Sequence, residues 1–161
     1  MRLFSLALVL LCCAAASGQN ARGYVFFAPG AESAQGANGG SVHAYGTGIG
    51  GELLLSPRIG AGIEGGAFVP GEGKFSNGVV GMFSTNAYVH ILRDRAFDPY
   101  LTGGYSLIFR DFTANGGNFG VGANYWFREK LGLLIEGRDH VASIHNVTNH
   151  FWEIRIGLTF Q

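Results

Sequence analysis

A strict two-residue period decides the fold, and it is clearest near the end of the chain, in Trp152-Glu153-Ile154-Arg155-Ile156-Gly157-Leu158-Thr159-Phe160. One parity is wholly apolar and consists of Trp152, Ile154, Ile156, Leu158 and Phe160. The other parity is charged, small or polar. Because successive side chains of a strand point to opposite faces, the stretch predicts a β-strand with one apolar and one polar face.

The same alternation recurs along the chain. It returns in residues 58–69, 79–92, 99–110, 117–128 and 131–141. Two further segments, 22–28 and 41–55, follow it less cleanly. About eight segments of roughly ten residues each are typical of a closed antiparallel barrel that crosses a bilayer. We therefore predict an all-β, up-and-down transmembrane barrel, whose closure leaves no strand edge without a hydrogen-bonding partner.

The composition favours a membrane over water. Charged residues make up 14% of the 161 residues, apolar residues 47%, and glycine occurs 27 times. Soluble domains carry about 25% charged residues, so this chain has few charges with which to cover a soluble surface. No stretch after the N-terminal segment is long and apolar enough for a membrane helix. The formal net charge of zero gives no field that would attract nucleic acid.

The apolar parity could face lipid or the interior of a soluble barrel. A secreted lipocalin-like barrel also has eight strands, but it would expose a glycine-rich, nearly uncharged outer surface, which is a poor soluble exterior. Turned inward, the small residues suit the narrow lumen of an eight-stranded barrel. Aromatic residues near strand ends, such as Trp152 and Phe160, resemble the girdles at membrane interfaces. The lipid-facing orientation is therefore favoured.

The first 18 residues are typical of a signal peptide. Met1-Arg2 is a short basic start, residues 3–11 are almost continuously apolar, and small residues follow up to Gly18. Cleavage after Gly18 or after Ala16 is compatible with this pattern. We predict that residues 1–18 are removed and that residues 19–161 form the barrel domain. Both cysteines, Cys12 and Cys13, precede the cleavage site, so disulfides are not expected; large leucines before them disfavour a lipoprotein.

The connections between the expected strands alternate in length. Short, charged or proline-marked connections are expected at 55–58, 92–99 and 127–130. Longer connections rich in Gly, Asn, Ser and Ala are expected at 29–41, 69–78, 110–118 and 142–150. Short periplasmic turns and longer external loops characterise outer-membrane barrels, and a periplasmic N-terminus puts all long connections outside.

The chain resembles the small outer-membrane barrels of the OmpA/OmpX type. The resemblance rests on Pro99-Tyr100-Leu101-Thr102-Gly103-Gly104-Tyr105, on residues 117–127 and on the final stretch from Trp152 to Phe160. It implies a monomeric protein in the bacterial outer membrane, with membrane lipids and the barrel-insertion machinery as partners. Members usually end in an aromatic residue; here Phe160 is penultimate and Gln161 is last. Because members differ in activity, the resemblance does not imply a particular function.

Opposite charges collect on the parity that would face the lumen. Its members are Glu52, Arg58, Glu64, Arg110, Glu136, Arg138, Glu153 and Arg155. Charges in a narrow, poorly hydrated space must pair, because an isolated buried ion is very costly. We predict a plug of salt bridges that closes the bore, since eight strands leave little open interior. The alternative is a small pore with a gated ion path.

A second polar cluster precedes the last strand. It contains Arg138, Asp139, His140, Ser143, His145 and His150. Serine, histidine and an acid could serve acyl transfer, but the order Ser143-Ile144-His145 does not match the strand motif of outer-membrane lipid deacylases. The three histidines could bind a metal, although their spacing on an expected loop is not diagnostic. Asp139 is anomalous, because strict alternation assigns this acid to the lipid-facing parity. Either it lies above the hydrocarbon or a bulge turns it inward.

These observations favour a non-enzymatic outer-membrane barrel with a structural or surface-interaction role. Its external loops would meet an unknown extracellular partner. The sequence predicts no cofactor, metal or catalytic residue. A small pore, a lipid-modifying enzyme and a secreted lipocalin-like barrel are the alternatives.

Overall fold

The computed structural model describes residues 20–34, 41–70, 78–92, 96–110, 113–144 and 147–161. Within these ranges the chain forms eight strands, and no helix there is long and apolar enough to cross a membrane. The strands are β1 (Ala21–Ala34), β2 (Ser41–Leu54), β3 (Ile59–Pro70), β4 (Val80–His90), β5 (Phe97–Phe109), β6 (Thr113–Arg128), β7 (Leu131–Ile144) and β8 (Val147–Phe160).

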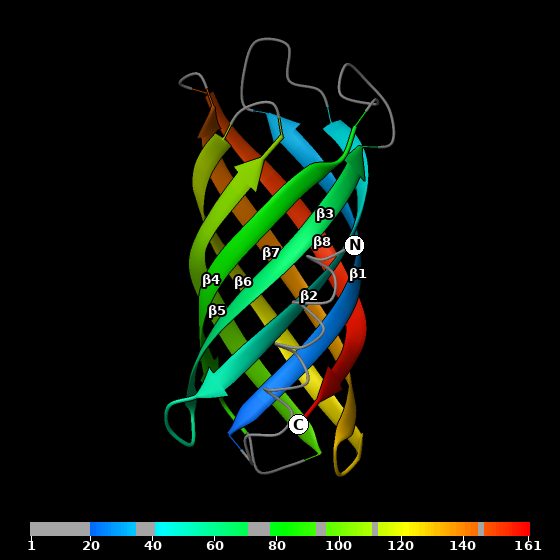
Figure 1. Ribbon diagram of the computed structural model, residues 1–161, viewed down its shortest axis with the longest axis vertical. Helices are drawn as coiled ribbons and strands as arrows, with labels where there is room; N and C mark the ends of the chain where they lie inside the picture. The colour runs from blue at the N-terminus through cyan, green and yellow to red at the C-terminus, as the bar shows by residue number, and fades with distance from the viewer. Residues whose placement is uncertain (1–19, 35–40, 71–77, 93–95, 111–112, 145–146) are drawn as a thin grey trace, which may run out of the picture.

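The strands form one closed barrel (Figure 1). Each strand pairs antiparallel with the next along the chain. The closing pair joins β1 to β8, with Gly23 opposite Phe160 and Gly30 opposite Glu153. The predicted all-β, up-and-down barrel is confirmed, and its closed hydrogen-bonded wall leaves no edge strand.

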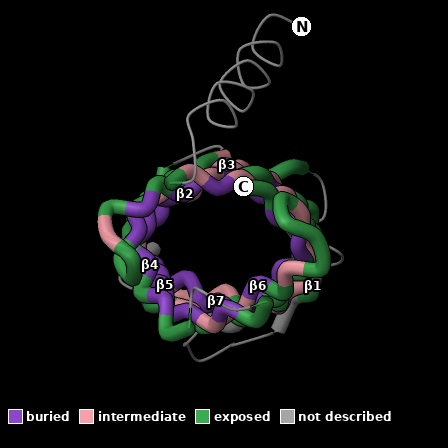
Figure 2. The backbone as a smooth tube through the Cα atoms, turned by 90° about the horizontal axis from the view of Figure 1, so that it is seen from below, coloured by how far each residue is buried: buried purple, intermediate pink, exposed green. Residues whose placement is uncertain are grey.

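The alternation of the sequence becomes an alternation between the two sides of the wall. Figure 2, viewed along the barrel, shows exposed and buried positions alternating around the ring. The outer side carries large apolar residues, including Ile63, Leu101 and Phe119, each more than half exposed. The five residues predicted to face lipid on β8 are all exposed on this outer side: Trp152, Ile154, Ile156, Leu158 and Phe160. An apolar outer wall of this kind suits hydrocarbon, not water.

At the end of the barrel where long connections were predicted, the strands are longer than the composition suggests. The segment 110–118 was expected to be a loop, but β5 ends at Phe109 and β6 begins at Thr113. The segment 142–150 is also mostly strand, because β7 reaches Ile144 and β8 begins at Val147. The predicted loop at 29–41 also begins too early, because β1 runs to Ala34. These predictions are wrong for one physical reason: the backbone N–H and C=O groups of Gly, Asn and Ser can complete a ladder that neighbouring strands offer, despite a composition typical of turns.

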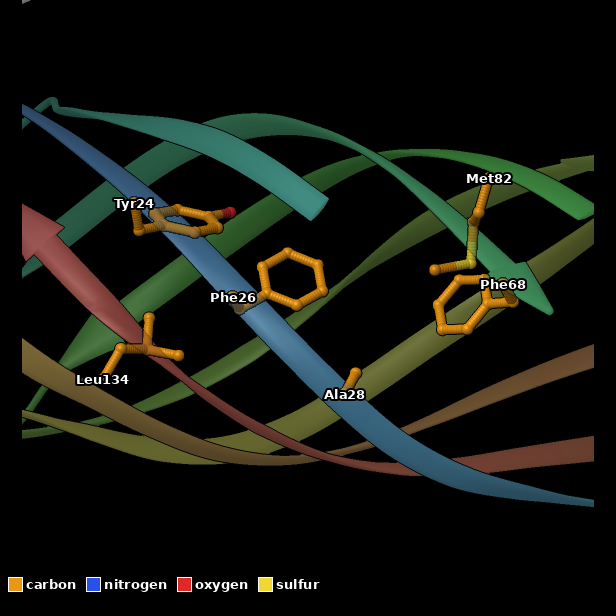
Figure 3. Packing of buried hydrophobic residues seen from close by; sticks show 6 residues of the cluster. All are labelled: Tyr24, Phe26, Ala28, Phe68, Met82 and Leu134. Atoms are coloured by element: carbon orange, nitrogen blue, oxygen red, sulfur yellow. The ribbon is translucent and has the colours of Figure 1, made fainter. Parts of the chain in front are cut away.

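Apolar side chains fill part of the interior. Figure 3 shows Tyr24, Phe26, Ala28, Phe68, Met82 and Leu134 pointing into the barrel. Three inward glycines of β2 make room for three of these rings: a Cβ atom would lie 2.4 Å from Tyr24 at Gly50, 2.4 Å from Phe26 at Gly48 and 2.3 Å from Phe68 at Gly46. The glycine-rich β2 is therefore the thin wall against which the aromatic residues pack.

Candidate functional site

The candidate site is the polar interior of the barrel, and Glu64 of β3 is its centre. Arg155 of β8 donates from Nη1 to Oε2 and from Nη2 to Oε1, both at 2.9 Å. Arg138 of β7 donates from Nη1 to Oε1 at 2.8 Å, and the Tyr24 hydroxyl donates to Oε2 at 2.9 Å. All four side chains are buried. One carboxylate on β3 thus accepts hydrogen bonds from three strands that do not neighbour it in the wall, β1, β7 and β8.

Two further carboxylates extend this network along β7 and β8. Glu136 accepts from Arg138 Nε at 2.5 Å and from the Tyr100 hydroxyl at 2.8 Å, and it lies 3.4 Å from Arg155. Glu153 accepts a hydrogen bond from Arg155 Nε. The guanidinium group of Arg155 also lies over the Phe26 ring, 4.3 Å from its centre. Every guanidinium group in this network has a charged partner, as burial requires.

A second cluster lies toward the end of the barrel that carries the short turns. His90 bridges two carboxylates, with Nε2 2.7 Å from Glu52 and Nδ1 2.9 Å from Asp98. Arg22 donates to Asp98 at 2.7 Å, and its guanidinium group lies 5.2 Å from the centre of the Trp126 ring. A neutral imidazole has one N–H donor, and an ionised carboxylate only accepts hydrogen bonds. Two hydrogen bonds from His90 to two carboxyl groups therefore require one additional proton, either on the imidazole or on one of the carboxyl groups.

The lumen also contains a serine, a histidine and a glutamate in series. Ser106 Oγ is 2.9 Å from His140 Nδ1, and His140 Nε2 is 3.1 Å from Glu153. The order serine, histidine, acid is that of a nucleophilic triad, but the ring nitrogens are exchanged, because in the triad the serine contacts Nε2 and the acid contacts Nδ1. Ser106 is fully buried, however, and its hydroxyl also contacts Ser84 and Asn118 at 2.9 Å. The arrangement satisfies buried polar groups and presents no exposed nucleophile.

The structure brings most predicted lumen charges inside. Six are buried in the interior: Glu52, Glu64, Glu136, Arg138, Glu153 and Arg155. The prediction differs from the structure for the other two. Arg58 is exposed, because it lies in the turn before β3 begins. Arg110 lies just beyond the end of β5 and is only partly buried; a Cβ atom added at Gly78 would lie 2.5 Å from its Nη2 atom.

The predicted charge network does not include several members of the interior. They are Arg22, Tyr24, Tyr88, His90, Asp98 and Tyr100. The polar parity of 79–92 contains both Tyr88 and His90, so alternation was sufficient to place them inward. Arg22 and Tyr24 fall in a segment that is apolar on both parities, where the period is obscured. Asp98 lies in the segment 92–99, which was expected to be a turn, but β5 already begins at Phe97.

The second predicted cluster does not form one site. Arg138 and His140 point into the lumen, whereas Asp139 and His150 meet on the outer side, where Asp139 Oδ2 is 2.8 Å from His150 Nδ1. Ser143 is exposed, and His145 lies outside the described residues. Among the side chains that the structure describes, no group of three or more could hold a metal ion.

Taken together, a closed eight-stranded wall with an apolar exterior and a filled, charge-paired interior defines a small barrel of the outer-membrane class. The family profile of the outer membrane protein beta-barrel domain matches residues 4–160, and the chain belongs to this family. Its resemblance to small eight-stranded outer-membrane barrels is confirmed, and a bacterial outer membrane is the location that the family indicates. No curated protein sequence matches the chain.

Solved structures share the fold at low sequence identity. Neisserial surface protein A is 14% identical with a TM-score of 0.70, and the match covers 88% of this chain and 99% of that one. The N-terminal barrel domain of Pseudomonas aeruginosa OprF is 16% identical with a TM-score of 0.55, covering 89% and 98%. Ail, the attachment invasion locus protein of Yersinia pestis, is 11% identical with a TM-score of 0.54, covering 89% and 100%. These likenesses establish the architecture, not a shared activity.

Proposed function

We propose that the protein is a non-enzymatic outer-membrane barrel with a plugged lumen, which presents its external connections to a partner at the cell surface. The observation that carries this proposal is the network of Glu64, Arg138 and Arg155, whose buried side chains meet across the interior. The longest connections on the external side, 35–40 and 71–79, are the candidate contact surface. Two proteins of the same fold bear the names of a surface protein and an attachment protein, which supports this role.

A plugged lumen predicts electrical silence. An ion crossing the barrel would have to displace ion pairs that are shielded from water, and breaking such a pair is costly. We expect the purified, folded protein to show no steady conductance in planar bilayers. Folding is verified by faster gel migration of the unboiled sample. A steady single-channel conductance of the unmodified protein would establish the alternative, a small pore.

A non-enzymatic role predicts that the Ser106–His140 pair is unreactive. Its hydroxyl is fully enclosed and shared with Ser84 and Asn118. We expect a fluorophosphonate probe, which labels activated serines, to leave the folded protein unlabelled. Labelling that disappears in Ser106→Ala would contradict the proposal and support a lipid-modifying enzyme.

Export by a removed signal peptide is part of the same proposal. The basic start, the apolar run and the small residues before Gln19 support cleavage near residue 18. Sequencing of protein recovered from outer membranes is expected to begin at Gln19, or at Ser17 if cleavage follows Ala16. A sequence that begins at Met1 would refute the export mechanism.

A further inference from the structure

The outer wall contains one acidic side chain that the barrel architecture does not explain. In β7, Asp139 stands opposite Phe119 of β6 and Trp152 of β8. Both aromatic neighbours are more than half exposed on the outer side, and residues opposite each other point to the same side of a sheet. Asp139 therefore faces outward, as strict alternation predicts, and a bulge does not turn it into the lumen.

Asp139 is nevertheless only 1% exposed, because rings close over it. Phe119 and Trp152 lie on the strands either side of it, and their ring centres are 6.3 Å apart in an edge-to-face arrangement. His150 stacks on Trp152 with ring centres 6.4 Å apart and an interplanar angle of 11°. The carboxylate thus lies at the floor of an aromatic enclosure on the outer surface.

The carboxylate is only half satisfied within this enclosure. His150 Nδ1 is 2.8 Å from Asp139 Oδ2. The other oxygen, Oδ1, is buried and finds no hydrogen-bond partner in the described chain. A buried carboxylate oxygen without a donor is unfavourable. The rings around the carboxylate are themselves open to the outside, since Phe119 and Trp152 are more than half exposed and the His150 side chain is 27% exposed. A donor from the membrane can therefore reach Oδ1 by a small displacement of these rings.

We propose that Phe119, Asp139, His150 and Trp152 form a binding site for the ammonium group of a membrane lipid. A primary ammonium group supplies the N–H donors that Oδ1 lacks, and aromatic faces attract cations. An anionic headgroup does not fit, because no lysine or arginine lies on the outer side of β6, β7 or β8 near Asp139; Arg128, opposite Leu131, is at the other end of β6.

The position of the site agrees with a lipid headgroup as the ligand. On β8 the outward apolar stretch runs from Phe160 to Trp152, and tryptophan is enriched where a protein surface passes from hydrocarbon to headgroups. Headgroup ammonium would therefore be delivered at the depth of Asp139. The proposal relies on the membrane location of the barrel and is independent of whether the lumen conducts.

Trp152 provides a direct readout of binding. The chain has two tryptophans, so Trp126→Phe leaves Trp152 as the sole indole emitter. We would titrate this variant in detergent with short-chain phosphatidylethanolamine and, separately, with phosphatidylglycerol of the same chain length. Saturable change in Trp152 emission with the ethanolamine lipid and none with the glycerol lipid is the expected result. Equal responses to both lipids would overturn the proposal.

Variants locate the effect on the carboxylate. Asp139→Asn, made in the same background, is expected to weaken ethanolamine-lipid binding by about tenfold, the size of one lost charge-assisted hydrogen bond. His150→Ala should also weaken it. His43→Ala is the matched control, because His43 is exposed on the outer side of β2, two strands from β8. Unchanged affinity in Asp139→Asn would refute the site.

Two additional titrations test the class of ligand. Free ethanolamine is expected to bind at least about tenfold more weakly than the lipid, because it lacks acyl contacts; equal affinity would overturn the assignment to a lipid. A response to magnesium chloride but not to the ethanolamine lipid would overturn it in favour of a divalent cation. Faster migration of unboiled samples verifies that each variant is folded, so a lost signal is not mistaken for a lost barrel.

Discussion

Arg155 and Glu64 form a two-point ion pair across the lumen, with both N–O distances at 2.9 Å. They belong to β8 and β3, which are separated in the barrel by β1 and β2. Backbone pairing alone cannot join these strands, so the side chains brace the wall from within. Planar, bidentate arginine–carboxylate pairs combine energy with geometric specificity, which suits a brace that determines which strands face each other.

Removing Arg155 is expected to destabilise the barrel strongly. Arg155→Leu removes one buried positive charge from the network and leaves Glu64 with Arg138 and Glu153 with His140 as their remaining partners. Breaking a buried ion pair typically costs about 3–5 kcal/mol. The free energy of unfolding in urea, measured in detergent or lipid, checks this. Arg58→Leu is the control, since Arg58 is exposed in a turn and should change stability by less than about 0.5 kcal/mol. Equal effects of the two variants would argue against the brace.

His90 is expected to stabilise the end of the barrel with the short turns. It contacts Glu52 and Asp98 through both ring nitrogens. His90→Gln cannot reproduce both contacts and should lower the free energy of unfolding by about 1–3 kcal/mol, the cost of a buried polar group left without a partner. His43→Gln, on the exposed outer side of β2, should be nearly neutral. Wild-type stability of His90→Gln would show that the bridge contributes nothing.

The two tryptophans should report opposite sides of the wall. Trp152 is 53% exposed on the outer side, whereas Trp126 lies against Arg22 in the interior. In vesicles with brominated acyl chains, emission should be quenched in Trp126→Phe, which retains Trp152, and largely preserved in Trp152→Phe. The reverse pattern would mean that the apolar side of the strands does not face lipid.

A charge on the outer side of β8 should be costly in a depth-dependent way. Ile156 lies midway between Trp152 and Phe160 on the exposed apolar side. Ile156→Arg is expected to lower folding stability in lipid by about 2–4 kcal/mol, as at the middle of a bilayer, and Phe160→Arg by only about 0–1 kcal/mol, as near an interface. Vesicle folding titrations measure both. Two equal, small effects would place this strand outside hydrocarbon.

Glycines on opposite sides of the wall should respond differently to a methyl group. At Gly157 a Cβ atom would lie 2.0 Å from the carbonyl oxygen of Val25, which the backbone of β1 holds in place. At Gly137 a Cβ atom would meet nothing within 4 Å. Gly157→Ala should therefore lose about 1–3 kcal/mol through overpacking, and Gly137→Ala should be tolerated. Thermal unfolding of the two variants provides the comparison.

The alternation of residues was sufficient to predict much of the fold and part of the site. It placed Glu64, Arg138 and Arg155 inward correctly, because a strand reverses the direction of its side chains at every residue whatever its neighbours are. It did not predict that β6 begins at Thr113 or that β7 reaches Ile144. Glycine, serine and asparagine gave a turn-like composition, while the pairing that extends these strands comes from other segments.

The sequence by itself determined the type of barrel: about eight strands, an apolar exterior, and opposite facing of Ile154 and Arg155. Only the tertiary structure decided which charges meet, because closure and stagger of the strands bring side chains of β3, β7 and β8 together across the lumen. It also decided the environment of Asp139. The local period directs this side chain outward, but its burial depends on Phe119, His150 and Trp152, which neighbouring strands supply. The direction of a side chain follows from the alternation of the strand backbone, whereas its contact partners depend on how the strands are paired in register.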